Sequence, residues 1–406
     1  MRARCQLGPG EVESLYGFLA ERLIHAGIET QPEVASKVLT IASDPGAGIG
    51  EYARVIRTDA ALSGRLLRLA NSAHFAQRSP ITSVDRACVM LGIERLRSLS
   101  LGFYLAKSAS RGTSGEFTRR VWGQSLFRAC LASELARRLA PALAAEAFVA
   151  GIMLDCGVPL MLKMLGPPYE DLLREGLHPP GQFHREWTSL PFTHVDVAAV
   201  LAKRWRLPPL LAKPIEWHHE PPVGGAPALQ EQQLHRVVYY AGAVDLKDRA
   251  TPERETAPSP GLASRHLGLA EPELLSVIEK ATSEYVAVQG VFAGVCDPLD
   301  DPESLAERVH LRMVRVLDDL IERTLASGAS PPAERFRLGG YQIEIQGDGI
   351  GMAAAYLTDR AGERIACCRV AASENSLALI RLAFSLDPAP DDDHEGIKGQ
   401  LRRLAA

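Results

Sequence analysis

The sequence predicts a mainly helical protein that is followed by a small C-terminal α+β unit. Between residues 11 and 140, apolar side chains recur at three- and four-residue spacing, as Leu62, Leu66 and Leu69 do, which is the period of an amphipathic helix. Turn residues separate these helices, and no strand-like alternation interrupts them. After the Gly- and Pro-containing residues 328–332 the period changes to two, which indicates strands.

Capping residues define the early helices. Asp59 can cap a helix that starts at Ala60, and a helix over residues 84–91 is expected to stop at Gly92. Amphipathic or buried apolar patterns predict further helices over residues 117–139, 144–165, 195–205, 210–219, 230–246, 271–292 and 302–325. This order of short and long helices is typical of an all-helical bundle.

The C-terminal segment is expected to form strands that are closed by a helix. Strands are predicted over residues 341–345, 352–357 and 364–370, with tight turns between them. Ser373 can cap a helix over residues 374–385, and an acidic tail begins near Asp391. We therefore divide the chain into a helical domain at 1–246 with its core at 32–219, a flexible connection at 247–262, a helical extension at 263–327, a small α+β domain at 336–388 and a tail at 389–406.

Composition is that of a soluble cytoplasmic protein. Of the 406 residues, 46% are hydrophobic and 23% are charged, which excludes a mostly disordered chain. We identify no apolar run of about 18 uncharged residues and no signal-peptide core, so we expect no membrane segment. The seven cysteines lack CxxC spacing, which is typical of reduced thiols in a cytoplasm.

The formal net charge of −4 hides an uneven distribution. Residues 51–128 contain 13 Lys or Arg and five Asp or Glu, a local excess of +8, so the rest of the chain sums to −12. The distribution, not the total, is therefore the guide to partners.

A long motif lies in this basic segment. It comprises DAALSGRLLRLANSAHF at residues 59–75, PITSVDRA at 80–87 and LGIERLR at 91–97. These segments resemble the HDOD family, which consists of bacterial signalling domains related to HD-type phosphohydrolases. The resemblance covers roughly residues 32–219 and implies an HD-like all-helical bundle with a role in signal transduction. The unit from residue 336 onward resembles no family that we can name.

The resemblance also implies a test for HD-type catalysis, in which a His, a His–Asp pair and a later Asp hold metal ions that activate a water. Gln124 stands at the position of the first His, and Leu154 replaces the His of the pair, although Asp155 is retained. Gly242 aligns with the closing Asp. Because leucine and glycine side chains cannot ligate a metal, we expect no HD metal site, no cofactor and no catalytic residues.

Three histidines leave one alternative open. In the wider HD superfamily, positions similar to those of His194, His218 and His219 can supply additional ligands, so a remnant pocket formed with Asp155 is conceivable. The simpler interpretation of the paired histidines is that they donate hydrogen bonds to the free carbonyls at the end of a helix.

The basic segment is the candidate interaction surface, because guanidinium groups bind carboxylates and phosphates well. The alternative is a solvated surface with scattered ion pairs and, for the short polar residues, helix capping. The candidate partner-binding residues are Arg65, Arg68, Asn71, Ser72, His74, Arg95 and Arg97.

Together these observations predict a non-catalytic bacterial signal-transduction protein, a regulatory HDOD module whose partners are other signalling proteins. The alternative is a degenerate HD-type phosphohydrolase that binds a nucleotide or cyclic dinucleotide, an anionic second messenger. Nucleic acid is disfavoured, because no DNA-binding motif is present and only 6% of the residues are aromatic. A homodimer formed through the C-terminal unit is also open.

Overall fold

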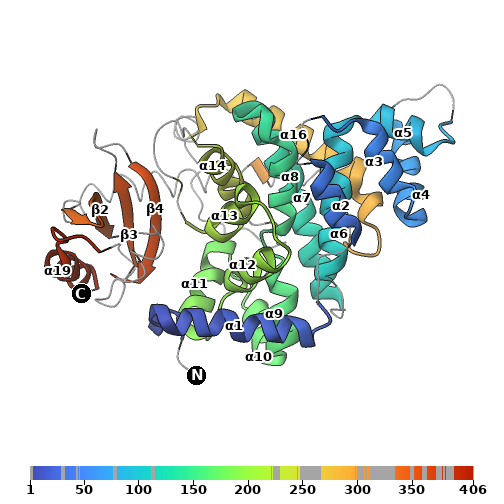
Figure 1. Cartoon of the computed structure of the whole chain (residues 1–406). Coiled ribbons are helices and arrows are strands. Elements are labelled where there is room, and N and C mark those ends of the chain that lie inside the picture. The colour runs from blue at the N-terminus through green and yellow to red at the C-terminus, as the bar shows by residue number, and fades with distance from the viewer. Residues whose placement is uncertain are drawn as a thin grey trace, which may run out of the picture.

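The computed structural model describes residues 3–28, 33–42, 46–75, 80–110, 115–220, 229–244, 267–297, 334–347, 352–358, 364–371 and 388–405, together with single positions between them. Helices make up the bundle, and an antiparallel sheet with one helix makes up the C-terminal unit (Figure 1). The predicted fold class, a mainly helical chain with a small C-terminal α+β unit, is therefore confirmed.

The helices of the first half are α1 (Pro9–His25), α2 (Glu33–Ala42), α3 (Ile49–Ile56), α4 (Ala60–Ala70), α5 (Val84–Leu91), α6 (Ile93–Ala109), α7 (Glu116–Leu139) and α8 (Ala144–Met153). They are followed by α9 (Gly157–Leu165), α10 (Pro167–Arg174), α11 (Pro179–Ser189), α12 (His194–Arg204), α13 (Pro209–Trp217), α14 (Gln230–Ala243) and α16 (Glu271–Val288). The short 3-10 helices are η1 (Arg4–Gln6), η2 (Ala73–Phe75), η3 (Pro141–Leu143) and η4 (Gln289–Phe292).

The predicted caps form where the sequence places them. The Asp59 carboxylate accepts a hydrogen bond from the Leu62 N–H at 2.9 Å and thereby caps α4. Helix α5 spans the predicted residues and ends at Gly92, whose φ of 79° is left-handed and therefore favours glycine.

The apolar stretch predicted as one helix over residues 144–165 is two helices, α8 and α9, with a turn at residues 154–156. A glycine follows this turn because the start of α12 lies against it: a Cβ atom on Gly157 would lie 2.0 Å from the His194 carbonyl oxygen. The turn thus carries Asp155 to the start of α12.

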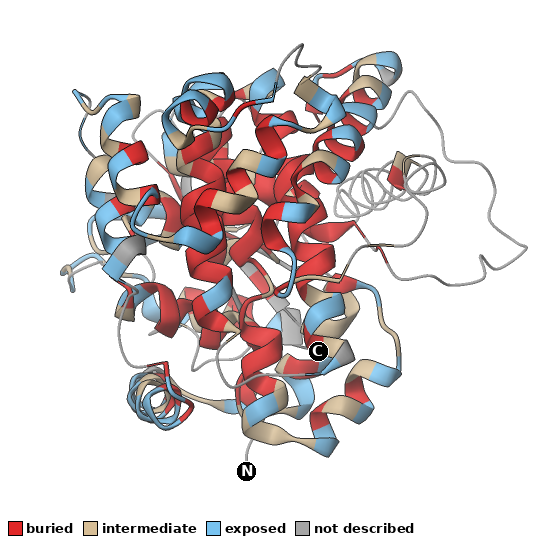
Figure 2. Cartoon of the chain, turned by 90° about the vertical axis from the view of Figure 1, so that its right-hand side faces the viewer, coloured by how far each residue is buried: buried red, intermediate tan, exposed pale blue. Residues whose placement is uncertain are grey.

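A single hydrophobic core runs through the bundle from Leu19 in α1 to Val309. Trp122 and Phe127 of α7 are fully buried at its centre, and Tyr285 of α16 packs against Phe127. Figure 2 shows the buried residues gathered in the interior of the helical bundle. The helical extension predicted after residue 263 therefore shares this core in its described part.

One stretch, Pro141–Leu165, is long and apolar enough to cross a membrane by length and composition. Of its most apolar window, 72% is buried inside the bundle, as is usual for a core helix of a soluble protein. No other described helix meets both criteria.

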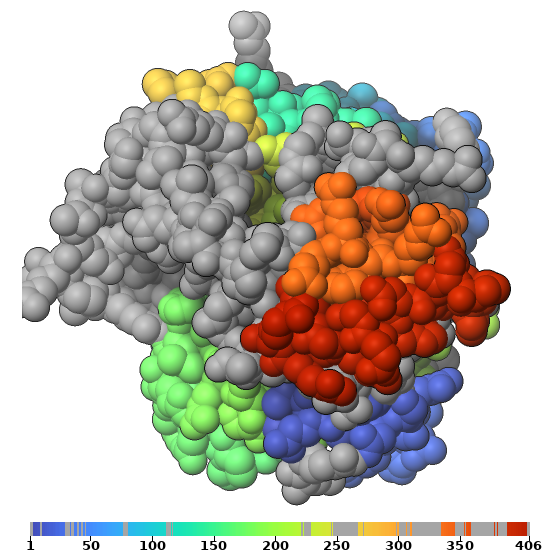
Figure 3. Space-filling view, turned by 90° about the vertical axis from the view of Figure 1, so that its left-hand side faces the viewer, coloured from blue at the N-terminus to red at the C-terminus, as the bar shows by residue number. Residues whose placement is uncertain are grey.

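The C-terminal unit is a four-stranded antiparallel sheet in the order β1 (Glu334–Leu338), β2 (Tyr341–Gly347), β3 (Met352–Thr358) and β4 (Arg364–Ala371). Strands β2 to β4 are the predicted ones. Strand β1 was missed because it has only five residues, three of them charged, and begins just after the breakers. Figure 3 shows this unit, in orange and red, as one patch on its face of the molecule.

The predicted acidic tail is corrected by the structure. Residues His394–Ala405 form a helix, α19, and its residues Ile397 and Leu401, four apart on one face, pack into the small core of the sheet. The predicted helices at 302–325 and 374–385 and the connection at 247–262 lie outside the described residues, apart from single positions in the two helices.

Candidate functional site

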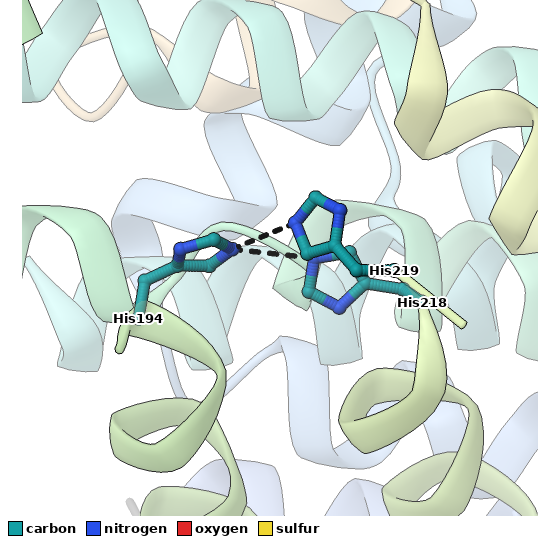
Figure 4. A group of neighbouring side chains, drawn as sticks. All are labelled: His194, His218 and His219. Atoms are coloured by element: carbon teal, nitrogen blue, oxygen red, sulfur yellow. Dashed lines mark hydrogen bonds between the residues drawn. The ribbon is translucent and has the colours of Figure 1, made fainter. Parts of the chain in front are cut away.

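Three histidine rings meet between two helices of the bundle (Figure 4). His194 is the first residue of α12, while His218 and His219 directly follow α13. The Nε2 atom of His194 lies 3.0 Å from that of His219 and 3.4 Å from that of His218. The structure thus brings together the three histidines that the sequence singled out.

The start of α12 is held by a capping box and by the N-terminal segment. The Thr193 hydroxyl accepts a hydrogen bond from the Asp196 N–H, while the Asp196 carboxylate accepts one from the Thr193 N–H. The buried Arg4 side chain donates to both Asp196 oxygens, at 2.9 and 3.0 Å, through its Nε, and its backbone N–H donates to the Leu190 carbonyl. Residues far upstream therefore fix the position of His194.

A buried carboxylate orients the His194 ring. Glu186 accepts hydrogen bonds from the His194 backbone N–H at 2.8 Å and from its Nδ1 at 2.6 Å, and also from the Tyr169 hydroxyl at 2.7 Å. Burial disfavours both charges, but their mutual attraction and hydrogen bonds prevail, raising the pKa of His194 and lowering that of Glu186. With Nδ1 held by Glu186, His194 directs Nε2 toward the other two rings.

The partly buried Asp155 forms an ion pair with the buried Arg128 of α7. The guanidinium also donates to the Val244 carbonyl at 3.1 Å, so it joins α7, the turn after α8 and the end of α14. The other Asp155 oxygen lies 3.8 Å from Nε2 of His194. The Arg128 guanidinium therefore occupies one side of Asp155, the only HD-type ligand residue that the sequence retains.

The remaining HD ligand positions also converge here, but they offer no ligand set. A Cβ atom on Gly242 would lie 3.0 Å from Cδ1 of Leu154 and 3.8 Å from the His218 ring. The Leu154 side chain thus takes up space where a second carboxylate or imidazole would be needed. The residues present do not fit the usual HD metal site.

The three imidazoles by themselves are a different donor set. Ligands around a tetrahedral zinc, with Zn–N bonds of about 2.0–2.1 Å, lie about 3.3 Å apart, close to the two spacings observed. Burial lowers the pKa of His218 to about 4, which keeps that ring neutral, and its Nδ1 is bonded to the Ile215 carbonyl. Imidazole donors suit zinc, copper or nickel more than magnesium. The nearby Arg128 guanidinium, by contrast, repels any cation.

A pocket of about 270 Å³ opens beside the cluster. Asp155, His194 and His219 line it together with Gln124 and Arg128 from α7. Figure 4 shows His219 above the two other rings, and its ring stacks on Phe183 at 4.6 Å. The pocket gives the candidate site access to small ligands.

The predicted partner-binding arginines are mostly engaged within the bundle. Arg65 donates to the Val291 and Ala293 carbonyls, Arg95 pairs with Glu284 of α16, and Arg97 pairs with Glu146 of α8. The basic excess of this segment is thus partly neutralised by acidic residues that lie later in the chain. These contacts match the alternative interpretation of the basic segment, in which its arginines form scattered ion pairs within the protein.

Of the other predicted residues of this surface, some make contacts within the protein and one is exposed. The Asn71 amide donates to the Leu67 and Ile81 carbonyls and accepts from the Ile81 N–H, which is the capping role. His74 lies 3.9 Å from Glu284, and the buried Ser72 hydroxyl has no hydrogen-bond partner among the described residues. Arg68 is exposed and makes no ion pair with a described residue. Of the candidate set, Arg68 is the cation that is available to a partner.

Sequence reasoning missed several residues that build the site. Arg128 entered only the charge count, and Arg4, Tyr169 and Glu186 were not singled out. Glu186 stands eight residues before His194, which gives no local pattern, and Arg4 is 192 residues from its partner Asp196. A buried charged pair between distant segments leaves no spacing signal in one sequence.

The bundle is an all-helical domain with a histidine cluster at the start of α12. Residues 28–221 match the profile of the HDOD domain, so this part of the chain is an HDOD domain, as the motif resemblance predicted.

Two solved structures share the fold. An HDOD domain protein of unknown function from Geobacter sulfurreducens is 23% identical with a TM-score of 0.50, over 68% of this chain and 97% of that one. A candidate signal transduction protein from Marinobacter aquaeolei VT8 is 17% identical with a TM-score of 0.52, over 67% and 61% of the two chains. An uncharacterized protein of Treponema pallidum is 26% identical over 238 residues, and the match spans 55% of this chain and 44% of that protein.

The pH dependence of stability tests how the histidine turn is held. His235 of α14 donates from Nε2 to the Trp217 and Glu220 carbonyls at 2.8 and 3.0 Å, and burial lowers its pKa to about 4 from 6.5. Because the unfolded chain binds this proton at higher pH than the folded chain does, the stabilisation is complete above pH 6.5 and is lost as the pH falls toward 4. We expect the stability advantage of wild type over His235→Gln to shrink by up to about 3 kcal/mol between pH 7 and 4 in urea unfolding. An advantage that stays constant over this range would contradict the neutral, buried state of His235.

Proposed function

We propose that this chain is a non-catalytic regulatory module of bacterial signal transduction and that it acts by binding other signalling proteins. The HDOD domain at residues 28–221 supports the signalling role, as does the fold shared with the Marinobacter protein. The single observation that carries the non-catalytic part is the replacement of the HD ligands around a largely buried Arg128–Asp155 pair.

That pair argues against metal-dependent hydrolysis on electrostatic grounds. A metal bound at Asp155 would stand beside the Arg128 guanidinium, and two like charges in a low-dielectric interior repel strongly. Leu154 and Gly242 supply no further ligand at their positions. We infer that Arg128 has taken the electrostatic role of the metal next to Asp155.

The proposed partner surface lies on helices α4 to α6. Val89 of α5 is 68% exposed, and Met90 and Ile93, near the junction of α5 and α6, are 38% and 37% exposed. Large apolar side chains exposed close together along the chain are typical of a protein-binding surface. With Arg68 on α4, they favour a partner surface of apolar side chains bordered by carboxylates.

A cytoplasmic location is part of the proposal. The described cysteines Cys5, Cys88, Cys130, Cys156 and Cys296 are all unpaired thiols, as expected for a reducing compartment.

Affinity capture with surface variants tests the partner surface. We expect Val89→Asp and Arg68→Glu to lose the proteins that wild type retains from the native cell, because each change opposes an apolar or acidic partner. Leu229→Asp, at a 55% exposed leucine before α14, is the matched control and is expected to retain them. Circular dichroism checks that all variants are folded.

Identical protein lists from wild type and from all three variants would count against the surface on α4 to α6. Asn71→Ala is unsuitable for this test, because the Asn71 amide bonds three backbone groups and its loss destabilises the fold.

The histidine cluster supports a second candidate function, an altered HD-type protein that binds a metal and, through it, a nucleotide. The observation in its favour is the convergence of three Nε2 atoms with the Glu186 carboxylate behind one ring, an arrangement that metal-binding histidines usually have.

Metal analysis separates the two functions. We expect purified protein to contain no stoichiometric manganese, magnesium or zinc, because the Arg128 guanidinium disfavours a cation at this position. Elemental analysis of wild type, Asp155→Ala and His219→Ala is the measurement. Stoichiometric metal in wild type that is lost in both variants would favour the second candidate over the first.

A further inference from the structure

The pocket beside the histidine cluster contains buried polar groups whose hydrogen-bonding capacity is unused. Gln124 lines the pocket and is only 7% exposed, and its side chain makes no hydrogen bond with a described residue. Arg128 also lines it and is 4% exposed, and its occluded Nε has no hydrogen-bond partner among the described residues. The Gln124 amide lines the cavity without a described partner, so a ligand in the pocket can pair with it, whereas the Arg128 Nε is closed off from the cavity.

The charges of the lining favour an anion. Arg120, Arg128 and Arg174 line the pocket, against one carboxylate, Asp155. Arg128 is paired with Asp155, and Arg174 is paired with acidic residues of its own helix. Arg120 is exposed and forms no ion pair with any residue that the structure describes. One guanidinium is thus free to meet a ligand charge from outside.

The remaining lining is apolar, with Phe117, Val121, Val158, Leu173 and Pro179 around the polar groups. An oxyanion accepts several hydrogen bonds and offers no donor, so it satisfies an amide N–H and guanidinium N–H groups together. The volume of about 270 Å³ is just below the range of about 300–1,000 Å³ that is usual for pockets of drug-sized ligands. A pocket of this volume suits a small molecule.

We propose that this pocket binds a small organic anion that carries one carboxylate or phosphate group on an apolar body. The anionic group accepts hydrogen bonds from the Gln124 amide, the Arg120 guanidinium adds its charge, and the apolar body packs against the side chains of α7 and α9–α11. The pocket is formed by helices other than those of the proposed partner surface, so this inference does not depend on partner binding.

The test uses three probes with the same short chain: butyrate, butyl phosphate and butanol. Each is titrated into the full chain while NMR follows the side-chain N–H signals of Gln124 and the Nε–H of Arg128. Saturable shifts are expected with at least one anion, with a Kd of about 1 mM or below, whereas butanol is expected to give none. The tighter anion then assigns the group as carboxylate or phosphate.

Variants locate the binding. Arg120→Gln and Gln124→Leu are each expected to raise the Kd at least about fivefold. Arg119→Gln is the matched control, because Arg119 is the neighbouring exposed arginine but pairs with Asp297 outside the pocket lining. Arg120 is exposed, so its variant keeps the test valid if the buried Gln124→Leu protein does not fold.

Three results would each overturn the proposal. The first is the absence of saturable shifts with both anions. The second is butanol binding as tightly as the anions, which would make the pocket an apolar cavity only. The third is an equal rise of the Kd in Arg120→Gln and in the control Arg119→Gln, which would show binding to surface charge in general.

Discussion

The largely buried ion pair between Arg128 and Asp155 is the interaction on which the site depends. Its guanidinium ties α7 to the turn between α8 and α9 and to the carbonyl of Val244 after α14. Removing one partner of such a pair leaves an uncompensated buried charge, at about 3–5 kcal/mol. The same pair sets the chemistry, because it places a fixed protein cation against the carboxylate that the HD-type resemblance implies as a metal ligand.

The rest of the pocket follows from how α12 begins. Glu186 holds the His194 ring, and Arg4, from a segment upstream of the HDOD match, holds the cap at Asp196. Helix α6, which borders the proposed partner surface, packs on α8, and α8 leads directly into the turn with Asp155. The pocket and the proposed partner surface on α4 to α6 are therefore built on the same hydrophobic core.

Local patterns in the sequence predicted the elements well, because caps and periodicity act over a few residues: α4 and α5 begin and end at their capping residues. The three histidines were also identified, since two of them are adjacent and the third opens a helix. The engaged state of Arg95 was not predictable, because Glu284, its partner, lies 189 residues away. Helix α19 was missed for a similar reason: its apolar face becomes visible only against the sheet it covers.

The most direct test of the central claim, that Arg128 replaces the metal and leaves no hydrolytic site, is a phosphodiester turnover assay. The full chain is incubated with a chromogenic phosphodiester and with nucleotides in the presence of manganese or magnesium. The account predicts no turnover above that of the metal ions alone, for wild type and Asp155→Ala alike. Turnover by wild type that Asp155→Ala abolishes would contradict it.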